Sequence, residues 1–228
     1  MTAIPPAPEP MHIVIDGGEI LADLACPAGA RGLVIFCHGS GSSRLSLRIR
    51  QVAASLQAHA LATLLLDLLT QDEEEQDRFS GGWRFDVALL ARRVGQAVDW
   101  AEERNALRGL PVGLFGSSTG AAAALMAAAE KTVRVRALVS RGGRPDLAGD
   151  ALPAVRSPVL LIVGGADHAV LELNRKAAQR LPRAELAIVS GAGHLFEEPG
   201  TLEQVADLAA RWFTTHLPAG PSGQRVSP

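Results

Sequence analysis

The sequence predicts an α/β fold in which a mostly parallel sheet of about eight strands carries helices on both faces. Short apolar segments alternate with amphipathic segments along the chain, which is typical of a parallel sheet covered by helices. Near the start, two strand-like segments flank Gly17-Gly18, a pair that favours a tight turn. The fold should therefore have an N-terminal antiparallel hairpin at one edge of the sheet.

Each strand is identified by its own apolar run. The hairpin is expected from Met11 to Asp16 and from Glu19 to Ala25, and six further strands are expected at 33–37, 62–67, 110–115, 135–140, 159–163 and 186–189. Apolar residues recur at helical spacing over 45–56, 83–104, 118–130, 170–181 and 201–212. The segment 71–77 is mostly acidic, so we expect a solvated loop there.

The 228 residues suffice for one domain with a substantial core. We expect the domain at 11–217, between a disordered Pro-rich segment at 1–10 and a disordered tail at 218–228. The net charge is −2 and no basic block occurs, which argues against nucleic-acid and membrane partners. The first ten residues lack the features of a secretory signal, so we expect a cytoplasmic protein, either a monomer or a homodimer.

The sequence contains no clear metal-binding or cofactor-binding motif. The two cysteines, Cys26 and Cys37, form no CxxC pair, and the six histidines show no HxxxH spacing. No glycine-rich dinucleotide motif occurs, and the run from Gly39 to Ser43 resembles a phosphate loop but is not followed by a lysine. We therefore expect no metal and no cofactor, and a nucleotide-binding protein is a minor alternative.

Polar residues follow several of the expected strands. Gly116-Ser117-Ser118-Thr119-Gly120 lies between a strand and an Ala-rich helix and matches the nucleophile elbow, G-x-S-x-G. In this turn the residues on either side of the serine come close together, and glycine removes the Cβ atoms that would clash. The bare motif is weak, but its position between strand and helix makes Ser118 the candidate nucleophile.

Asp167 and His194 each follow a later strand, after Gly164-Gly165-Ala166 and Gly191-Ala192-Gly193. Asp167 is equally compatible with a triad acid and with a helix N-cap. The carboxyl ends of parallel strands meet at one edge, so the three side chains should converge there. The order Ser118, Asp167, His194 then predicts a catalytic triad for acyl transfer.

On these motifs, with His38-Gly39-Ser40-Gly41, the chain resembles the α/β-hydrolase superfamily and its dienelactone-hydrolase-like branch over residues 11–217. The resemblance implies an α/β-hydrolase fold and a cofactor-free hydrolase acting on a small acyl substrate, an ester, thioester or lactone. It also implies an oxyanion hole formed by the backbone N–H groups of Ser40 and Thr119, with His38 orienting the loop. Dienelactone hydrolases carry a cysteine nucleophile, whereas position 118 is serine, and no insertion is long enough for a large cap domain.

Three arginines, Arg44, Arg141 and Arg144, fall in loops expected to face the site. The planar guanidinium suits carboxylate and phosphate groups, so these residues are candidate ligands of an anionic substrate. The alternative is that they form surface ion pairs, for example with Asp146 or Glu197. A non-catalytic binding protein on the same fold is the alternative to a hydrolase, because a fold does not prove chemistry.

Overall fold

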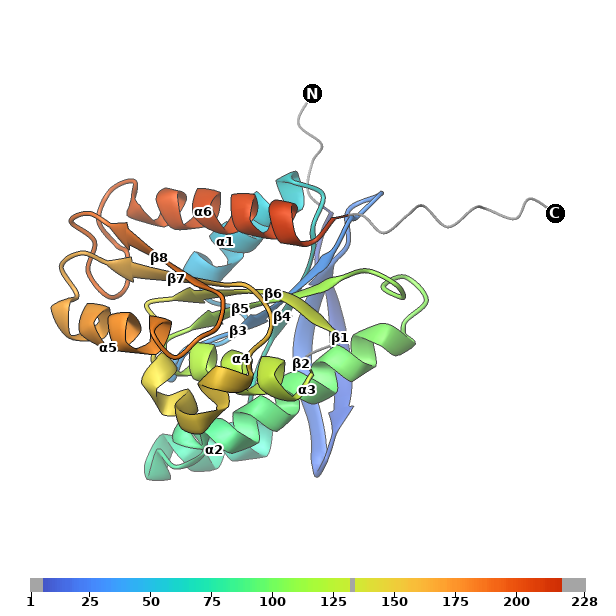
Figure 1. Cartoon of the computed structure of the whole chain (residues 1–228). Coiled ribbons are helices and arrows are strands. Elements are labelled where there is room, and N and C mark those ends of the chain that lie inside the picture. The colour runs from blue at the N-terminus through green and yellow to red at the C-terminus, as the bar shows by residue number, and fades with distance from the viewer. Residues whose placement is uncertain (1–5, 132–133, 219–228) are drawn as a thin grey trace.

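Eight strands form one sheet in the parts of the chain that the computed structural model describes, residues 6–131 and 134–218 (Figure 1). The strands are β1 (Glu9–Ile15), β2 (Gly18–Ala25), β3 (Leu33–Cys37), β4 (Ala62–Leu66), β5 (Val112–Ser117), β6 (Val135–Arg141), β7 (Val159–Gly164) and β8 (Ala184–Val189). Their order across the sheet is β1-β2-β4-β3-β5-β6-β7-β8. The β1–β2 and β2–β4 pairs are antiparallel and all other pairs are parallel, which confirms the predicted fold class.

Helices cover both faces of this sheet. They are α1 (Leu47–Ala58), α2 (Gln71–Ser80), α3 (Val87–Glu103), α4 (Thr119–Glu130), α5 (His168–Ala178) and α6 (Thr201–His216), with 3-10 segments η1 (Trp83–Phe85) and η2 (Pro145–Ala154). Figure 1 shows α1 and α6 on one side of the sheet and α3 and α4 on the other. Within the described residues, no helix combines the length and the apolar character needed to cross a bilayer.

The core consists of two apolar layers separated by the sheet. All five residues of β3 are buried, and they alternate between the layers: Leu33 and Ile35 pack with α3 and α4, while Val34 and Phe36 pack with α1 and α6. This alternation follows from the two-residue period of a strand. A strand covered on both faces therefore needs apolar residues at every position, as the sequence of β3 indicates.

Three boundaries differ from the expectation. Strand β1 begins at Glu9, so Glu9 and Pro10 belong to the sheet and not to a disordered segment; residues 1–5 and 219–228 lie outside the described residues. The prediction of a loop over 71–77 is wrong, because these residues form most of α2. The helix expected over 83–104 is divided at Asp86, whose side chain accepts the Leu89 N–H and starts α3.

The strand order creates a crevice between β3 and β5. The chain passes from β3 to β4 on one side and returns to β5 on the other, so the helices that follow β3 and β5 lie on opposite faces. Ligands of such sheets bind at this switch point, beyond the carboxyl ends of the strands. The His38 loop follows β3 and Ser118 follows β5, so both lie at this crevice.

Candidate active site

Ser118 occupies a strained turn between β5 and α4. Its backbone has φ 50° and ψ −122°, a conformation that residues other than glycine rarely adopt. A Cβ at Gly116 would lie 2.8 Å from the backbone nitrogen of Ala121, and one at Gly120 would overlap the carbonyl oxygens of Cys37 and His38. Only glycine fits at these two positions, and the turn has the form of a nucleophile elbow.

The loop after β6 holds this turn on both sides. The Ser118 N–H donates to the Arg141 carbonyl at 3.4 Å, and the Arg144 N–H donates to the Ser118 carbonyl at 3.0 Å. A strained backbone persists only where its surroundings fix it. The segment 141–144 therefore supports the conformation that aims the Ser118 side chain away from the sheet.

Asp167 serves two purposes at once. Its Oδ1 accepts a hydrogen bond from the Val170 N–H at 3.5 Å, which caps α5, and its Oδ2 accepts a hydrogen bond from Nδ1–H of His194 at 2.7 Å. Asp167 therefore caps α5 and is also hydrogen-bonded to His194, while its role as a triad acid stays a prediction. With the proton on Nδ1, the Nε2 atom of His194 is free to accept one.

His194 and Ser118 contact the same short segment. A Cβ on Gly142 would lie 3.6 Å from Cε1 of His194, so the imidazole packs directly against this glycine. The neighbouring Arg141 carbonyl binds Ser118 as described above. Among the described residues, no hydrogen bond joins the Ser118 hydroxyl to His194 in this structure; bonds of this type commonly tighten only in the substrate complex.

His38 is held by the backbone through both ring nitrogens. Nε2 accepts the Leu68 N–H at 3.2 Å, and Nδ1 donates to the Gly39 carbonyl at 2.9 Å. Burial lowers the pKa of His38, opposed by the Gly39 hydrogen bond and by the charges of Asp67 and Glu74. A neutral ring with both nitrogens engaged orients the loop and is not available as a base.

The Ser40 N–H, expected in the oxyanion hole, has a partner within the protein. It donates to the hydroxyl Oγ1 of Thr119 at 2.9 Å. Gly39 lies against Ser118, since a Cβ at this glycine would be 2.9 Å from Cβ of Ser118. The loop after β3 therefore contacts the elbow at two points: Gly39 packs against Ser118, and the Ser40 N–H binds the side chain of Thr119.

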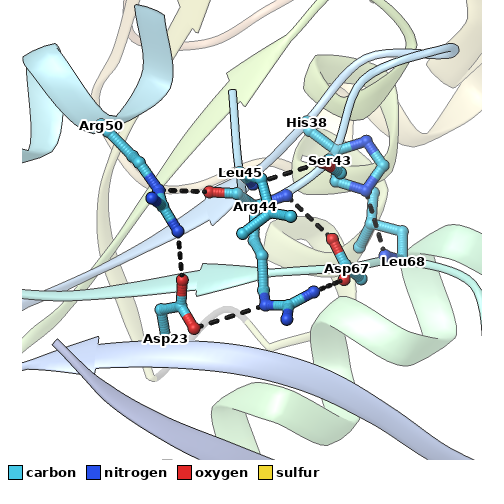
Figure 2. Close-up of polar contacts among 8 residues, drawn as sticks. All are labelled: Asp23, His38, Ser43, Arg44, Leu45, Arg50, Asp67 and Leu68. Carbon is cyan, nitrogen blue, oxygen red and sulfur yellow. Dashed lines mark hydrogen bonds and ion pairs between the residues drawn. The ribbon is translucent and has the colours of Figure 1, made fainter. Parts of the chain in front are cut away.

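Arg44, a candidate substrate ligand, forms ion pairs within the protein, which is the alternative expected from the sequence, and its role in substrate binding stays a prediction. Figure 2 shows its guanidinium between two carboxylates: Nε donates to Asp23 at 3.3 Å, and Nη1 pairs with Asp67. Its backbone N–H also donates to Asp67 at 2.8 Å. Arg50 completes the cluster by binding Asp23 at 2.9 Å, so the charge of Arg44 is already neutralised.

The other two arginines differ from each other. Arg144 forms the alternative ion pair with Asp146, at 2.8 and 2.9 Å, which raises its pKa. Arg141 is 7% exposed and donates to the His194 carbonyl at 3.4 Å, with its guanidinium 5.5 Å from the ring centre of Phe196. Burial, followed by the charge of Arg48, lowers the pKa of Arg141 to about 10. Glu197, the other partner expected for these arginines, pairs with Arg48 instead, at 2.8 Å.

A cavity of about 490 Å³ lies beside the elbow. Its walls come from the loop after β3, the start of α1, the loop after β4, α2, η1 and α3, and Thr119 lines it at the elbow. Apolar contacts come from four leucines, and charged side chains also line it: Leu45, Leu68, Leu69, Leu90, Arg48, Asp67, Glu74, Asp77, Arg78 and Arg84. Ser118, Asp167 and His194 do not line this cavity, but Gly39 and Thr119, which adjoin Ser118, do.

Sequence reasoning missed the wall formed by α2 and η1. Asp77 is 2% exposed and accepts the Trp83 N–H at 2.7 Å and the Arg84 guanidinium. Burial opposes its ionisation, but these hydrogen bonds prevail and lower its pKa. The available signal was Thr70-x-x-Glu73, which forms a capping box at the start of α2.

No group of three or more His, Cys, Asp or Glu side chains suited to a metal ion occurs within residues 6–131 and 134–218.

Cys37 is buried at the end of β3, and burial raises the pKa of its thiol to about 12. A thiol of this kind is a poor nucleophile at neutral pH. Ser118 is therefore a better candidate nucleophile than Cys37.

The parallel sheet, the elbow after β5 and the Asp167–His194 pair together define an α/β-hydrolase. The chain belongs to the dienelactone hydrolase family, whose model matches residues 22–215. It is similar to a crystal structure of a dienelactone hydrolase from Anabaena variabilis, with 50% identity, a TM-score of 0.91, and coverage of 92% of this chain and 98% of that one. The family model and this solved structure therefore agree on the family and the fold of the chain.

Two further proteins are similar to this chain. Est1E from Butyrivibrio proteoclasticus shares the fold, with a TM-score of 0.77 at 18% identity and coverage of 91% and 98% of the two chains. A Mycobacterium tuberculosis protein named "Putative phosphoribosyl transferase" is 54% identical over 217 residues, which is 94% of this chain and 48% of that protein. The chain therefore spans about half the length of this curated relative.

Proposed function

We propose that the protein is a serine hydrolase that cleaves a carboxylic ester, or a related thioester or lactone, through an acyl-enzyme. The observation that carries the proposal is the 2.7 Å hydrogen bond from His194 to Asp167 at the sheet edge where the strained turn presents Ser118. Hydroxyl, imidazole and carboxylate on three separate strand ends are the groups that this chemistry requires.

The first half of the reaction forms the acyl-enzyme. Ser118 Oγ attacks the acyl carbon while Nε2 of His194 takes the hydroxyl proton, and Asp167 stabilises the imidazolium. The tetrahedral intermediate then collapses, the bond to the alcohol breaks, and His194 gives the proton to the leaving alcohol. In the second half, water attacks the acyl carbon with His194 again as base, which releases the acid and restores Ser118.

The substrate is expected to be small. The cavity of about 490 Å³ beside the elbow would hold one arm of an ester, with leucines around its apolar part. Three arginines also line it. Arg48 and Arg84 pair with Glu197 and Asp77, whereas Arg78 forms no ion pair within residues 6–131 and 134–218, so we expect a polar or anionic group of the substrate near Arg78. The dienelactone substrate itself is not implied, since position 118 is serine.

The direct test is hydrolysis of p-nitrophenyl acetate by the wild type and by Ser118→Ala. Loss of the nucleophile should reduce kcat/KM by at least about 10³-fold. A fluorophosphonate probe should label the wild type at Ser118, as read by mass spectrometry of the modified peptide. Equal rates for the two proteins, without labelling at this residue, would contradict the proposal and leave the non-catalytic binding protein.

Ser117→Ala is the matched control. Ser117 adjoins the proposed nucleophile, but it is 4% exposed and its hydroxyl is buried without a hydrogen-bond partner among the described residues. Replacing it removes an unsatisfied polar group, so stability should not fall. Its activity should stay within about 3-fold of the wild type, which shows that any loss in Ser118→Ala is specific to that hydroxyl.

A further inference from the structure

The hydroxyl of Thr119 lies between an expected oxyanion donor and the cavity. Its Oγ1 accepts the Ser40 N–H at 2.9 Å, so this N–H is directed at a side chain and not at open space. Thr119 is also the residue directly after Ser118 and a lining residue of the cavity, with 5% of its surface exposed. The Ser40 N–H, expected as an oxyanion donor, is therefore already bound to the hydroxyl of Thr119.

A threonine hydroxyl has one proton to donate and two lone pairs. The bond from Ser40 uses a lone pair, and within residues 6–131 and 134–218 no other hydrogen bond involves this oxygen. The proton of Thr119 is therefore available to a group in the cavity. A hydroxyl that already accepts a hydrogen bond is polarised and becomes a stronger donor.

The backbone N–H of Thr119 is also available. Thr119 is the first residue of α4, where the N–H groups have no acceptor within the helix. The same residue thus offers two donors, one from the backbone and one from the side chain, next to the proposed nucleophile. Paired donors directed at one oxygen are the arrangement that stabilises a developing oxyanion.

We propose that Thr119 is a further catalytic residue, whose side-chain hydroxyl donates to the oxyanion formed when Ser118 attacks. The Ser40 N–H binds and polarises this hydroxyl, and it does not contact the oxyanion itself. This inference rests on the proposed function and deepens it. It replaces one backbone donor by a side chain, which makes this part of the oxyanion hole accessible to mutation.

Thr119→Val tests the hydroxyl, because valine keeps the shape of the side chain and removes the oxygen. We expect kcat for p-nitrophenyl acetate to fall about 10²-fold, as for the loss of an oxyanion donor. KM should change less than about 3-fold, because the ground-state carbonyl carries little charge. Thr119→Ser keeps the hydroxyl and should retain kcat within about 5-fold of the wild type.

The outcomes separate this inference from the proposed function. If Ser118→Ala is as active as the wild type, both fail together. If activity depends on Ser118 but Thr119→Val is as fast as the wild type, or faster, the Thr119 assignment alone fails and the released Ser40 N–H is the donor.

A purely structural role for Thr119 would give a different pattern. The bond from Ser40 would then only tie the loop after β3 to α4. Thr119→Val would then raise KM together with the loss in kcat, because the loop that lines the cavity would shift. That result would overturn the assignment, whereas a loss in kcat with KM within about 3-fold of the wild type supports it at any melting temperature, since the Ser40 N–H loses its acceptor in either case.

Discussion

His38 is a half-buried imidazole that orients the loop around the site. Its neutral form satisfies the Leu68 N–H and the Gly39 carbonyl at the same time, with one nitrogen accepting and the other donating. A second proton would have to sit on Nε2, opposite the Leu68 N–H, so protonation would break this contact. The loop conformation therefore depends on the neutral ring.

This dependence predicts how stability changes with pH. Burial lowers the pKa of His38 from 6.5, so the unfolded chain takes up a proton more readily than the folded one. The contribution of His38 is fully present above about pH 6.5 and is lost as the pH falls toward the folded pKa. His38→Leu should destabilise the protein by about 1–3 kcal/mol at about pH 8, because the Leu68 N–H loses its acceptor.

Urea unfolding of both proteins at about pH 8 and about pH 5.5 measures the effect. The difference in unfolding free energy between wild type and His38→Leu should shrink at the lower pH. An equal difference at both pH values would show that protonation of His38 does not contribute, and that only packing is lost.

Single residues also show what the sequence could reveal of the site. Asp167 and Ser118 were predictable because each follows a strand within a glycine-rich turn. The ion pairs of Arg44 were not predictable, since its partners Asp23 and Asp67 are 21 and 23 residues away in the sequence and only the folded sheet brings them together. The contact from Ser40 to Thr119 spans 79 residues and has no local sequence signal.

At the scale of elements, the Arg44 cluster joins the loop after β3 to two strands. Asp23 lies in β2 and Asp67 directly follows β4, so one guanidinium connects three segments (Figure 2). The side chains of Arg44 and the two aspartates are 20%, 13% and 13% exposed, so the pairs are partly shielded from water. Removing one partner from such a cluster leaves carboxylates without compensation.

Arg44→Met should therefore lower the unfolding free energy by about 2 kcal/mol, as measured by urea denaturation. Arg50→Met is the matched control, because Arg50 binds Asp23 at 2.9 Å but is 43% exposed; it should cost less than about 1 kcal/mol. Arg44→Met should change kcat/KM for an anionic and a neutral ester of equal size in the same proportion. A selective loss for the anionic ester would support Arg44 as a substrate ligand.

Helix α2 is acidic and nevertheless helical, because its capping residues favour a helix. Its acidic composition predicted a solvated loop. However, Asp72, Glu73 and Glu74 lie in the first helical turn, where negative charge is favourable. The reciprocal bonds between Thr70 and Glu73 then satisfy two free N–H groups. Local capping signals outweighed the charge density, and the cavity wall formed by this helix was missed with it.

At the scale of the whole molecule, the fold was predictable because its strands are buried on both faces. Such strands carry continuous apolar runs that a sequence displays directly, as in β3, β5 and β7. The sheet order and the switch between β3 and β5 then follow from the α/β-hydrolase resemblance. The cavity was not predictable, because its walls come from seven segments that meet only in the folded chain.

Two exposed leucines near the start of α1 allow a test of whether this cavity receives the substrate. Leu45 is 52% exposed and lines the cavity, whereas Leu47 is 83% exposed and does not. A larger side chain at Leu45 should narrow the space for a long acyl or alcohol group while leaving a short one unaffected. The same change at Leu47 alters the surface only.

Leu45→Trp should lower the ratio of kcat/KM for p-nitrophenyl octanoate to that for p-nitrophenyl acetate by about 10-fold, a loss of the size that several apolar contacts produce. Leu47→Trp should leave this ratio within about 2-fold of the wild type, since a surface change of this kind has small effects. An unchanged ratio in both variants would mean that the long substrate leaves the elbow in another direction. In that case the wall formed by α2 and η1 would not set the chain length that the enzyme accepts, because Leu45 and that wall line the same cavity.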